Sequence, residues 1–245
     1  NSKELVIINL STNPFTESGI FNAPGNTDAK GVFVQGNVGY MTSGNYLYSF
    51  DLTSKTGTRP LLDPDGVLFA STTTSLYVVE NYAYVATHNT AKEFQIINIS
   101  DPNNLSVVGE LNLPGGIGRG IFVNSSGTRA YVVTATNAQQ ELFIIDITDK
   151  SNPQLIGSYD TNGMDPRGVT VVPGNRAIIV GYNAEEYQVI DLASESSPRR
   201  CGGTNIDSGI NGIASVLESD GDAYSYIVTS EADAEFRIIE GGPGG

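Results

Sequence analysis

The feature that most constrains the fold is a six-residue phrase that returns throughout the chain. Each copy is apolar and rich in β-branched residues, and most copies carry Asn or Asp at the fifth position. The copies begin at Leu5, Leu47, Phe94, Leu142, Tyr187 and Phe236. A strand-forming phrase that recurs about every 45 residues is typical of an array of sheet units, each of which uses the phrase as one strand.

Two further strands recur with this phrase. The first is short and apolar, opens with Gly in most copies, and is spaced by 44, 45, 48 and 44 residues. Its copies begin at Gly31, Ser75, Gly120, Gly168 and Gly212. The second follows after a turn such as Ser126-Gly127, whose Gly supplies the positive φ of a tight hairpin. This spacing is that of a propeller blade, so the sequence predicts an all-β propeller of four-stranded antiparallel blades.

The recurring phrase is then the third strand of each blade. Its Asn or Asp is placed to accept backbone N–H groups in the following turn. More polar outer strands come next, at residues 106–111, 154–159 and 200–204. The Gly that opens the inner strand lets backbones approach closely where strands converge on a narrow axis. No stretch has the apolar period of a helix, so we expect essentially no helix.

The five inner strands predict five blades, or six or more if upstream sequence is missing. We assign residues 1–240 to one propeller domain and the Gly-rich residues 241–245 to a linker leading to a missing region. The last repeat stops after its third strand, and we expect residues 15–22 to supply its fourth strand and close the ring. Residues 5–10 are then a third strand without inner partners. Loss of upstream sequence explains such a strand, and pairing with the open edge of a neighbouring chain is the alternative.

The charge and the rare residues of the chain exclude several functions. The formal net charge is −14, from 13 basic and 27 acidic side chains, and such a surface repels phosphate backbones and anionic headgroups. We therefore expect no nucleic acid partner, and no apolar run is long enough for membrane insertion. Cys201 is the only cysteine and His88 the only histidine. A disulfide framework and a multi-thiolate or multi-histidine metal site are excluded within one chain, and we expect His88 in an exposed loop.

The residue before each inner strand is expected to face one mouth of the central channel. These residues are Lys30, Thr74, Arg119, Arg167 and Asn211. Three of the five are cations, and channel mouths are common ligand sites in propellers. We predict a pocket for a small anionic ligand such as a carboxylate, with Arg119 and Arg167 as bidentate donors. The alternative is that the cations pair with nearby acids, such as Asp28 and Asp165, and brace the blade junctions.

Two other kinds of site have weaker support. A glycosidase needs two carboxylates across the channel, but the inner strands carry none, and Asp28, Asp165 and Asp207 lie in connecting loops. Some acid pairs resemble calcium loops only loosely, because they lack the required ligand spacing, and we interpret them as turn residues. These pairs are Asp63/Asp65, Asp220/Asp222 and Glu231/Asp233. We predict no cofactor and no metal site, and leave weak Ca²⁺ binding open.

The repeated segments resemble the LVIVD-repeat β-propeller family. The resemblance rests on phrases such as Leu142-Phe143-Ile144-Ile145-Asp146, on the Gly-Val-x-Val starts and on the Ala-Tyr-Val second strands, and it covers residues 4–240. It implies a bacterial or archaeal propeller, extracellular or at the cell surface, within a larger protein and without an assigned activity or catalytic motif. Ser75 in place of Gly, and Glu240 in place of the final Asn or Asp, are departures confined to single blades.

The sequence therefore predicts a non-catalytic interaction module or structural head, extracellular or at the cell surface. Its partner is expected to be a protein or a small anionic ligand. One alternative is a glycoside-processing hydrolase with carboxylates at the channel mouth. Another is a self-assembling subunit joined by exchange of its N-terminal strand; in the absence of such exchange we expect a monomer.

Overall fold

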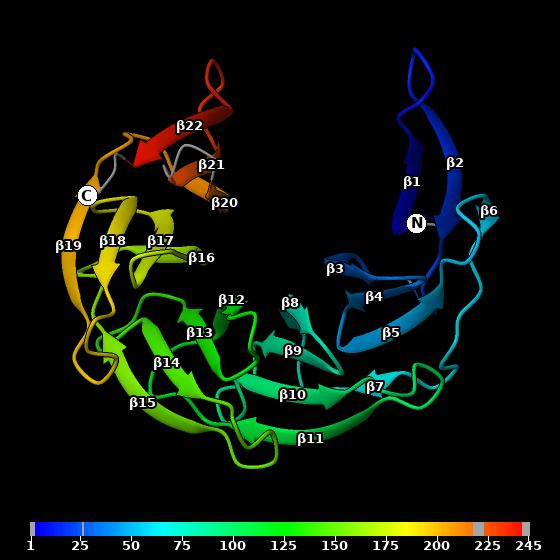
Figure 1. Ribbon diagram of the computed structural model, residues 1–245, viewed down its shortest axis with the longest axis horizontal. Coiled ribbons are helices and arrows are strands. Elements are labelled where there is room, and N and C mark those ends of the chain that lie inside the picture. The colour runs from blue at the N-terminus through cyan, green and yellow to red at the C-terminus, as the bar shows by residue number, and fades with distance from the viewer. Residues whose placement is uncertain (1–2, 26, 218–222, 242–245) are drawn as a thin grey trace.

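The computed structural model describes residues 3–25, 27–217 and 223–241, and it shows β-sheets arranged around an open ring (Figure 1). Every regular element within these residues is a strand, and they contain no helix that could cross a membrane. The ring opens between the first strand, β1 (Leu5–Asn9), and the last, β22 (Phe236–Gly241). The predicted all-β propeller of antiparallel blades is confirmed.

Five sheets, here called blades 1 to 5, share one plan in which the strands follow chain order and pair antiparallel from the inside of the ring outward, although β6 leaves blade 1 for another sheet. The inner strands are β3 (Ala29–Gln35), β8 (Thr73–Val79), β12 (Gly118–Val123), β16 (Asp165–Val172) and β20 (Ile210–Leu217). The second strands are β4 (Val38–Ser43), β9 (Tyr82–Thr87), β13 (Arg129–Thr134), β17 (Arg176–Tyr182) and β21 (Ala223–Thr229). The third strands are β5 (Tyr46–Asp51), β10 (Phe94–Asn98), β14 (Leu142–Asp146), β18 (Tyr187–Asp191) and β22.

The outer strands complete four of the five blades. They are β7 (Val67–Leu68), β11 (Ser106–Leu111), β15 (Gln154–Tyr159) and β19 (Arg199–Thr204). Among the described residues, blade 5 consists of β20, β21 and β22 alone. The recurring phrase of the sequence is the third strand in every blade, as predicted.

The N-terminal sheet differs from the predicted closure of the ring. β1 pairs with β2 (Thr16–Phe21), and β6 (Gly57–Thr58) adds to β2 in parallel. Residues 15–22 therefore form the outer neighbour of β1, and the expectation that they complete blade 5 is wrong. The reason is packing: Phe21 stacks on Phe50 of blade 1 with ring centroids 4.2 Å apart, inside a buried cluster that fixes β2 at this end of the ring. β1 is a third strand without inner partners, as predicted.

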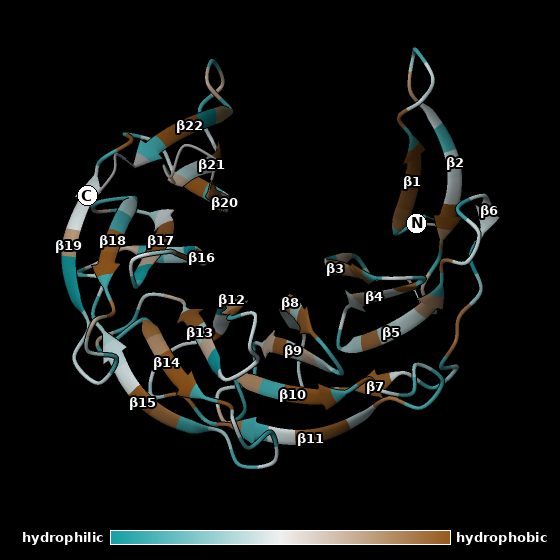
Figure 2. Ribbon diagram, in the orientation of Figure 1, coloured by the Kyte–Doolittle hydropathy of each residue, from teal (hydrophilic) through white to brown (hydrophobic). Residues whose placement is uncertain are grey.

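The core lies between neighbouring blades, because each sheet carries apolar side chains on both faces. Tyr84, Phe94 and Phe143 belong to a buried cluster that joins blades 2 and 3. Ile144 and Ile179 belong to the cluster that joins blades 3 and 4. Middle strands are thus covered on both sides, which explains why the recurring phrase is apolar throughout and does not alternate. Figure 2 shows this as continuous hydrophobic colour on strands such as β14.

The Asn or Asp that ends the third strand of blades 1 to 4 shapes the next turn, as predicted. Asp146 accepts the backbone N–H of Thr148 at 2.9 Å, and Asp191 accepts that of Ala193 at 2.9 Å. These hydrogen bonds favour the ionised carboxylates and lower the pKa of both groups. The turn predicted at residues 220–222 and residues 242–245 of the predicted linker lie outside the described residues.

Candidate functional site

Each inner strand carries a β-bulge close to its start. At this point the pairing with the second strand skips one residue, and it does so in all five blades. The skipped residues are Lys30, Thr74, Arg119, Arg167 and Asn211. They are the five residues that the sequence assigned to the channel mouth. A bulge leaves its residue unpaired and turns the side chain in a new direction, and bulges are frequent beside binding sites.

These five positions lie at the rim of the ring where the inner strands begin, here called the mouth rim. Thr74 Oγ1 donates to the carbonyl oxygen of Gly118 in the next blade at 2.8 Å. Asn211 accepts a hydrogen bond from the Tyr182 hydroxyl of blade 4, and its Nδ2 donates to Ser230 Oγ at 3.1 Å. Thr74 and Asn211 therefore brace neighbouring elements.

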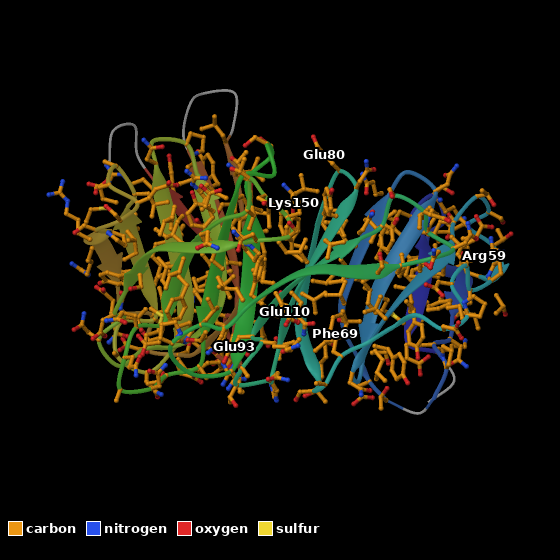
Figure 3. All side chains as sticks on the ribbon, turned by 90° about the horizontal axis from the view of Figure 1, so that it is seen from below. Arg59, Phe69, Glu80, Glu93, Glu110 and Lys150 are labelled. Atoms are coloured by element: carbon orange, nitrogen blue, oxygen red, sulfur yellow. The ribbon has the colours of Figure 1, made fainter. Side chains whose placement is uncertain are left out.

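The opposite rim, here called the far rim, holds the turns that follow the inner and third strands. Seen from the side, Glu93 and Phe69 lie toward one edge of the ring, and Glu80 and Lys150 toward the other (Figure 3). Glu93 heads a third strand and Phe69 follows an outer strand, so both lie near the mouth rim. Glu80 and Lys150 belong to turns of the far rim.

His88 joins the mouth rim from the loop between β9 and β10. Its backbone N–H donates to the carbonyl oxygen of Thr72 at 2.8 Å. Burial lowers the pKa of His88, and the positive charges of Arg119 and Lys30 lower it further. The imidazole thus lies near cations from both neighbouring blades. We call Lys30, Thr74, His88, Arg119, Arg167 and Asn211 the mouth cluster.

Arg167 is held in place by neighbouring side chains. One of its terminal nitrogens pairs with Asp165 Oδ2 at 2.8 Å, and its guanidinium lies over the Tyr182 ring, 4.9 Å from the centroid. Asp165 also accepts the backbone N–H of Thr136 at 3.2 Å. For Arg167, the structure therefore shows the alternative that the sequence left open, in which a cation of the mouth pairs with a neighbouring acid.

Lys30 and Arg119 differ from every other cation in the chain. Of the remaining eleven, seven pair with carboxylates and four donate to other acceptors. Within the described residues, neither Lys30 nor Arg119 has a hydrogen-bond or ion-pair partner, and the Nε of Arg119 is buried. Burial lowers the pKa of Arg119, and the charge of Arg167 lowers it further, while Asp165 acts in the opposite direction.

Two more of the acidic residues singled out by the sequence, Asp63 and Glu231, serve as structural acceptors. Asp63 accepts the backbone N–H groups of Asp65 and Leu105, at 3.1 and 2.9 Å, and Glu231 pairs with Arg237. In the part of the chain that the structure describes, no three or more His, Cys, Asp or Glu side chains form a group that could hold a metal. The pair Asp220/Asp222 lies outside that part.

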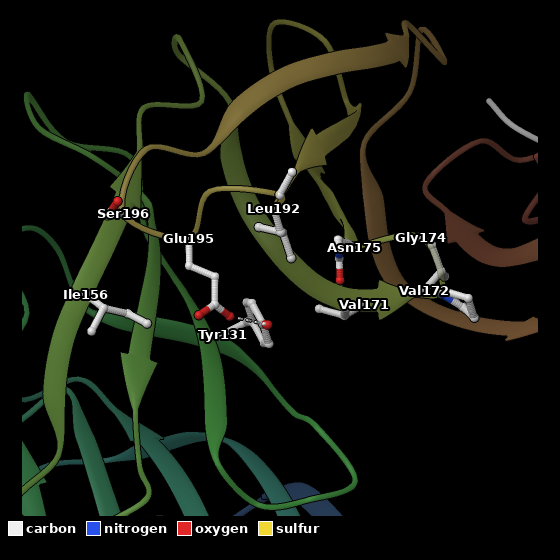
Figure 4. Close-up of a pocket in the computed structure, with 11 residues that line it drawn as sticks. Tyr131, Ile156, Val171, Val172, Gly174, Asn175, Leu192, Glu195 and Ser196 are labelled. Carbon is white, nitrogen blue, oxygen red and sulfur yellow. Dashed lines mark hydrogen bonds between the residues drawn. The ribbon is translucent and has the colours of Figure 1, made fainter.

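A hollow with a volume of about 580 Å³ opens on the far rim between blades 3 and 4 (Figure 4). Glu195, from the turn after β18, accepts hydrogen bonds from the Tyr131 hydroxyl at 3.2 Å and from Arg129 Nε at 2.8 Å. Burial and the negative charge of Glu195 raise the pKa of Tyr131 to about 12. Through these contacts, Glu195 of blade 4 is bonded to blade 3. Sequence reasoning missed the hollow, because its lining comes from turns and strands of different repeats.

Comparison with known proteins identifies the repeats. The family model of the LVIVD repeat matches residues 71–112 and 118–161, which contain blades 2 and 3, so the predicted LVIVD repeats are confirmed. No curated protein matches the sequence.

Solved structures of similar fold include propellers of low sequence identity. A protein from Lactobacillus plantarum is 13% identical with a TM-score of 0.67, and the match covers 92% of this chain and 73% of that one. A functionally unknown protein from Desulfotomaculum acetoxidans is 12% identical with a TM-score of 0.69, over 96% and 81%. The β-propeller domain of Cps50 (Swd1) from Myceliophteria thermophila is 11% identical with a TM-score of 0.64, over 94% and 78%. These likenesses show the fold alone.

Proposed function

We propose that this LVIVD-repeat chain is a non-catalytic binding module that takes a small anionic ligand at the mouth cluster, within an extracellular or cell-surface protein. The observation that carries the proposal is the pair of cations, Lys30 and Arg119, without partners among the described residues. His88 between them and Arg167 beside them add to the same site.

The charge balance of the chain makes these two cations unusual. Acidic side chains outnumber basic ones by 27 to 13, so acceptors for a cation are plentiful in this chain. The other eleven cations all have acceptors. Like charges gathered in one place raise the local positive potential and favour an anion.

The chemistry of the mouth cluster favours a small ligand with a carboxylate or phosphate group. A guanidinium presents a planar fork that fits such oxygens, and a neighbouring ammonium adds a compact positive charge. The net charge of −14 acts against long polyanions, because every further negative group of such a ligand meets an acidic surface. An acidic side chain of a protein partner or a free dicarboxylate meets both conditions, because each carries a carboxylate group and neither is a long polyanion.

The test is calorimetric titration of the full chain with malonate and, separately, with inorganic phosphate at low ionic strength. The variant Lys30→Ala/Arg119→Ala removes two charges that have no protein partner, so we expect an unchanged melting temperature and an affinity at least roughly tenfold lower. Affinity for the unmodified chain is expected to fall with added salt, because the site is open to solvent.

Arg176→Ala is the matched control, since it removes a cation whose partner is the Cys201 sulfur of blade 4 and leaves the mouth cluster intact. It should bind both anions as the unmodified chain does. An equal loss of binding in the control and in the double variant would show a non-specific charge effect. The proposal fails in that case, and also if neither anion binds the unmodified chain.

A further inference from the structure

A repeated glutamate holds every full outer strand next to its third strand. This Glu directly precedes the third strand, or in one case β1, and its Oε2 accepts the backbone N–H of the second residue after the outer strand. The pairs are Glu4 with Ala23 (3.0 Å), Glu93 with Leu113 (2.9 Å), Glu141 with Thr161 (3.0 Å) and Glu186 with Ile206 (3.0 Å). Glu93, Glu141 and Glu186 are buried. We call this contact the strand clamp.

Blade 5 carries the same glutamate in a different setting. Glu235 directly precedes β22, but its side chain is exposed, and only its backbone carbonyl oxygen accepts a hydrogen bond among the described residues, from Thr229. β22 pairs with β21 on one side, and its other edge has no described neighbour. Blade 5 therefore has the acceptor of a strand clamp and a strand edge beside it.

The face of blade 5 turned away from blade 4 is apolar as well. Phe236 and Ile238 on β22 are 60% and 57% exposed, and Val228, paired with Phe236, is 49% exposed. On the opposite face, Ile227 is fully buried in the cluster shared with blade 4. In blades 2 and 3 the corresponding outward faces are buried against the next blade. An exposed apolar patch of this kind indicates an interaction surface.

We propose that blade 5 accepts a further repeat of this same type, supplied from outside residues 1–245. Its first element adds antiparallel to β22 as an outer strand, and a backbone N–H at the end of that strand completes the strand clamp with Glu235. The rest of the repeat covers Phe236 and Ile238. This proposal is independent of the anion site, because it concerns Glu235 and the free edge of β22 and involves none of the mouth cluster.

A second copy of residues 1–245 is a poorer occupant. Its outer strands β2, β11, β15 and β19 are already paired with their own third strands, so the part of it that the structure describes has no spare outer strand to offer. The solved propellers described above extend beyond the part that this chain covers, which fits an additional repeat.

The probe for the test is a synthetic peptide with the sequence of residues 149–161. This segment contains the turn before β15, the strand itself and Thr161, whose N–H completes the strand clamp of blade 3. We expect the peptide to bind the full chain and to slow hydrogen exchange of the β22 amides, measured by mass spectrometry. Glu235→Ala should fold normally, because its side chain is exposed, and should bind the peptide at least roughly tenfold more weakly.

Two comparisons decide the outcome. A peptide carrying Leu155→Pro and Ser158→Pro loses two backbone N–H groups of the strand and should give no protection. Equal protection by both peptides, or equal affinity of Glu235→Ala and the unmodified chain, would overturn the proposal. A third result would also overturn the proposal: light scattering shows the molecular mass doubling with concentration, and the peptide does not protect the β22 amides. That result would mean that a second copy of the chain binds the edge of β22.

Discussion

Glu141 shows at the scale of one residue how a blade is held together. Its side chain is buried, one carboxylate oxygen accepts both the backbone N–H and the hydroxyl of Thr161, at 3.0 and 2.9 Å, and the other accepts the N–H of Asn137 at 3.3 Å. Folding removes this N–H from water. If its acceptor is then lost, the N–H has no hydrogen-bond partner in the folded chain, and this costs free energy. The strand clamp is therefore a structural use of a carboxylate, and no catalytic role is needed to explain it.

We expect Glu141→Ala to lower the free energy of unfolding by about 2–4 kcal/mol, because it leaves the buried N–H and hydroxyl of Thr161 without an acceptor. Urea denaturation followed by circular dichroism measures the change. Glu110→Ala is the matched control: Glu110 forms an exposed ion pair with Lys92, and its loss should cost less than about 1 kcal/mol. Similar losses in the two variants would mean that the strand clamp contributes no more than a surface charge.

At the scale of strands and turns, the closest backbone contacts occur at outer-strand glycines. A Cβ at Gly157 would lie 1.8 Å from the carbonyl oxygen of Glu195, and one at Gly109 would lie 2.0 Å from that of Lys150. Both carbonyls belong to the turn that follows the third strand of the next blade. β11 and β15 thus need Gly where the neighbouring turn crosses them.

Gly157→Ala is expected to destabilise the chain by about 3 kcal/mol, because the turn at Glu195 must move to admit the methyl group. Gly212→Ala should change stability by no more than about 0.5 kcal/mol, since no described atom lies within 4 Å of a Cβ there. Thermal unfolding of the two variants side by side measures the difference. The packing explanation is wrong if Gly212→Ala proves the more damaging of the two.

The sequence predicted the strands and turns well, because their signals are local. The apolar phrase, the Gly starts and the Asp or Asn turns are each complete within a few neighbouring residues. The strand clamp and the contact at Gly157 could not be found in this way. Glu141 and Thr161 lie far apart in the chain, and Glu195 reaches Gly157 from the next blade. Each of these residues occupies a fixed position in its repeat. Which residues it contacts is seen only once the blades are packed together.

At the scale of the whole molecule, the open ring decides which residues meet. The sequence located the five bulged residues of the mouth rim, because each precedes a recognisable inner strand. It did not place His88 beside Lys30 and Arg119, since the loop that carries His88 has no repeat signal of its own. Closure of the ring by residues 15–22 was the other failure. That prediction was made because blade 5 has no fourth strand in the sequence, but β2 pairs with β1 instead.

The single histidine of the chain provides the most direct measurement of the proposed anion site. Desolvation lowers the pKa of His88 below its usual value of 6.5, and Arg119 and Lys30 lower it further, because protonation would add a third charge to theirs. An anion bound among these groups offsets the repulsion, so it must raise that pKa. Lys30→Ala/Arg119→Ala must also raise it, and must remove the response to the anion.

The experiment is an NMR titration of the His88 imidazole from pH 4 to pH 8, about the range over which a perturbed histidine titrates. It compares the unmodified chain and the double variant, each with and without malonate at constant ionic strength. We predict a low His88 pKa in the unmodified chain, a rise in that pKa when malonate is added, and a raised, malonate-insensitive pKa in the double variant. A His88 pKa that malonate leaves unchanged in the unmodified chain would contradict this prediction.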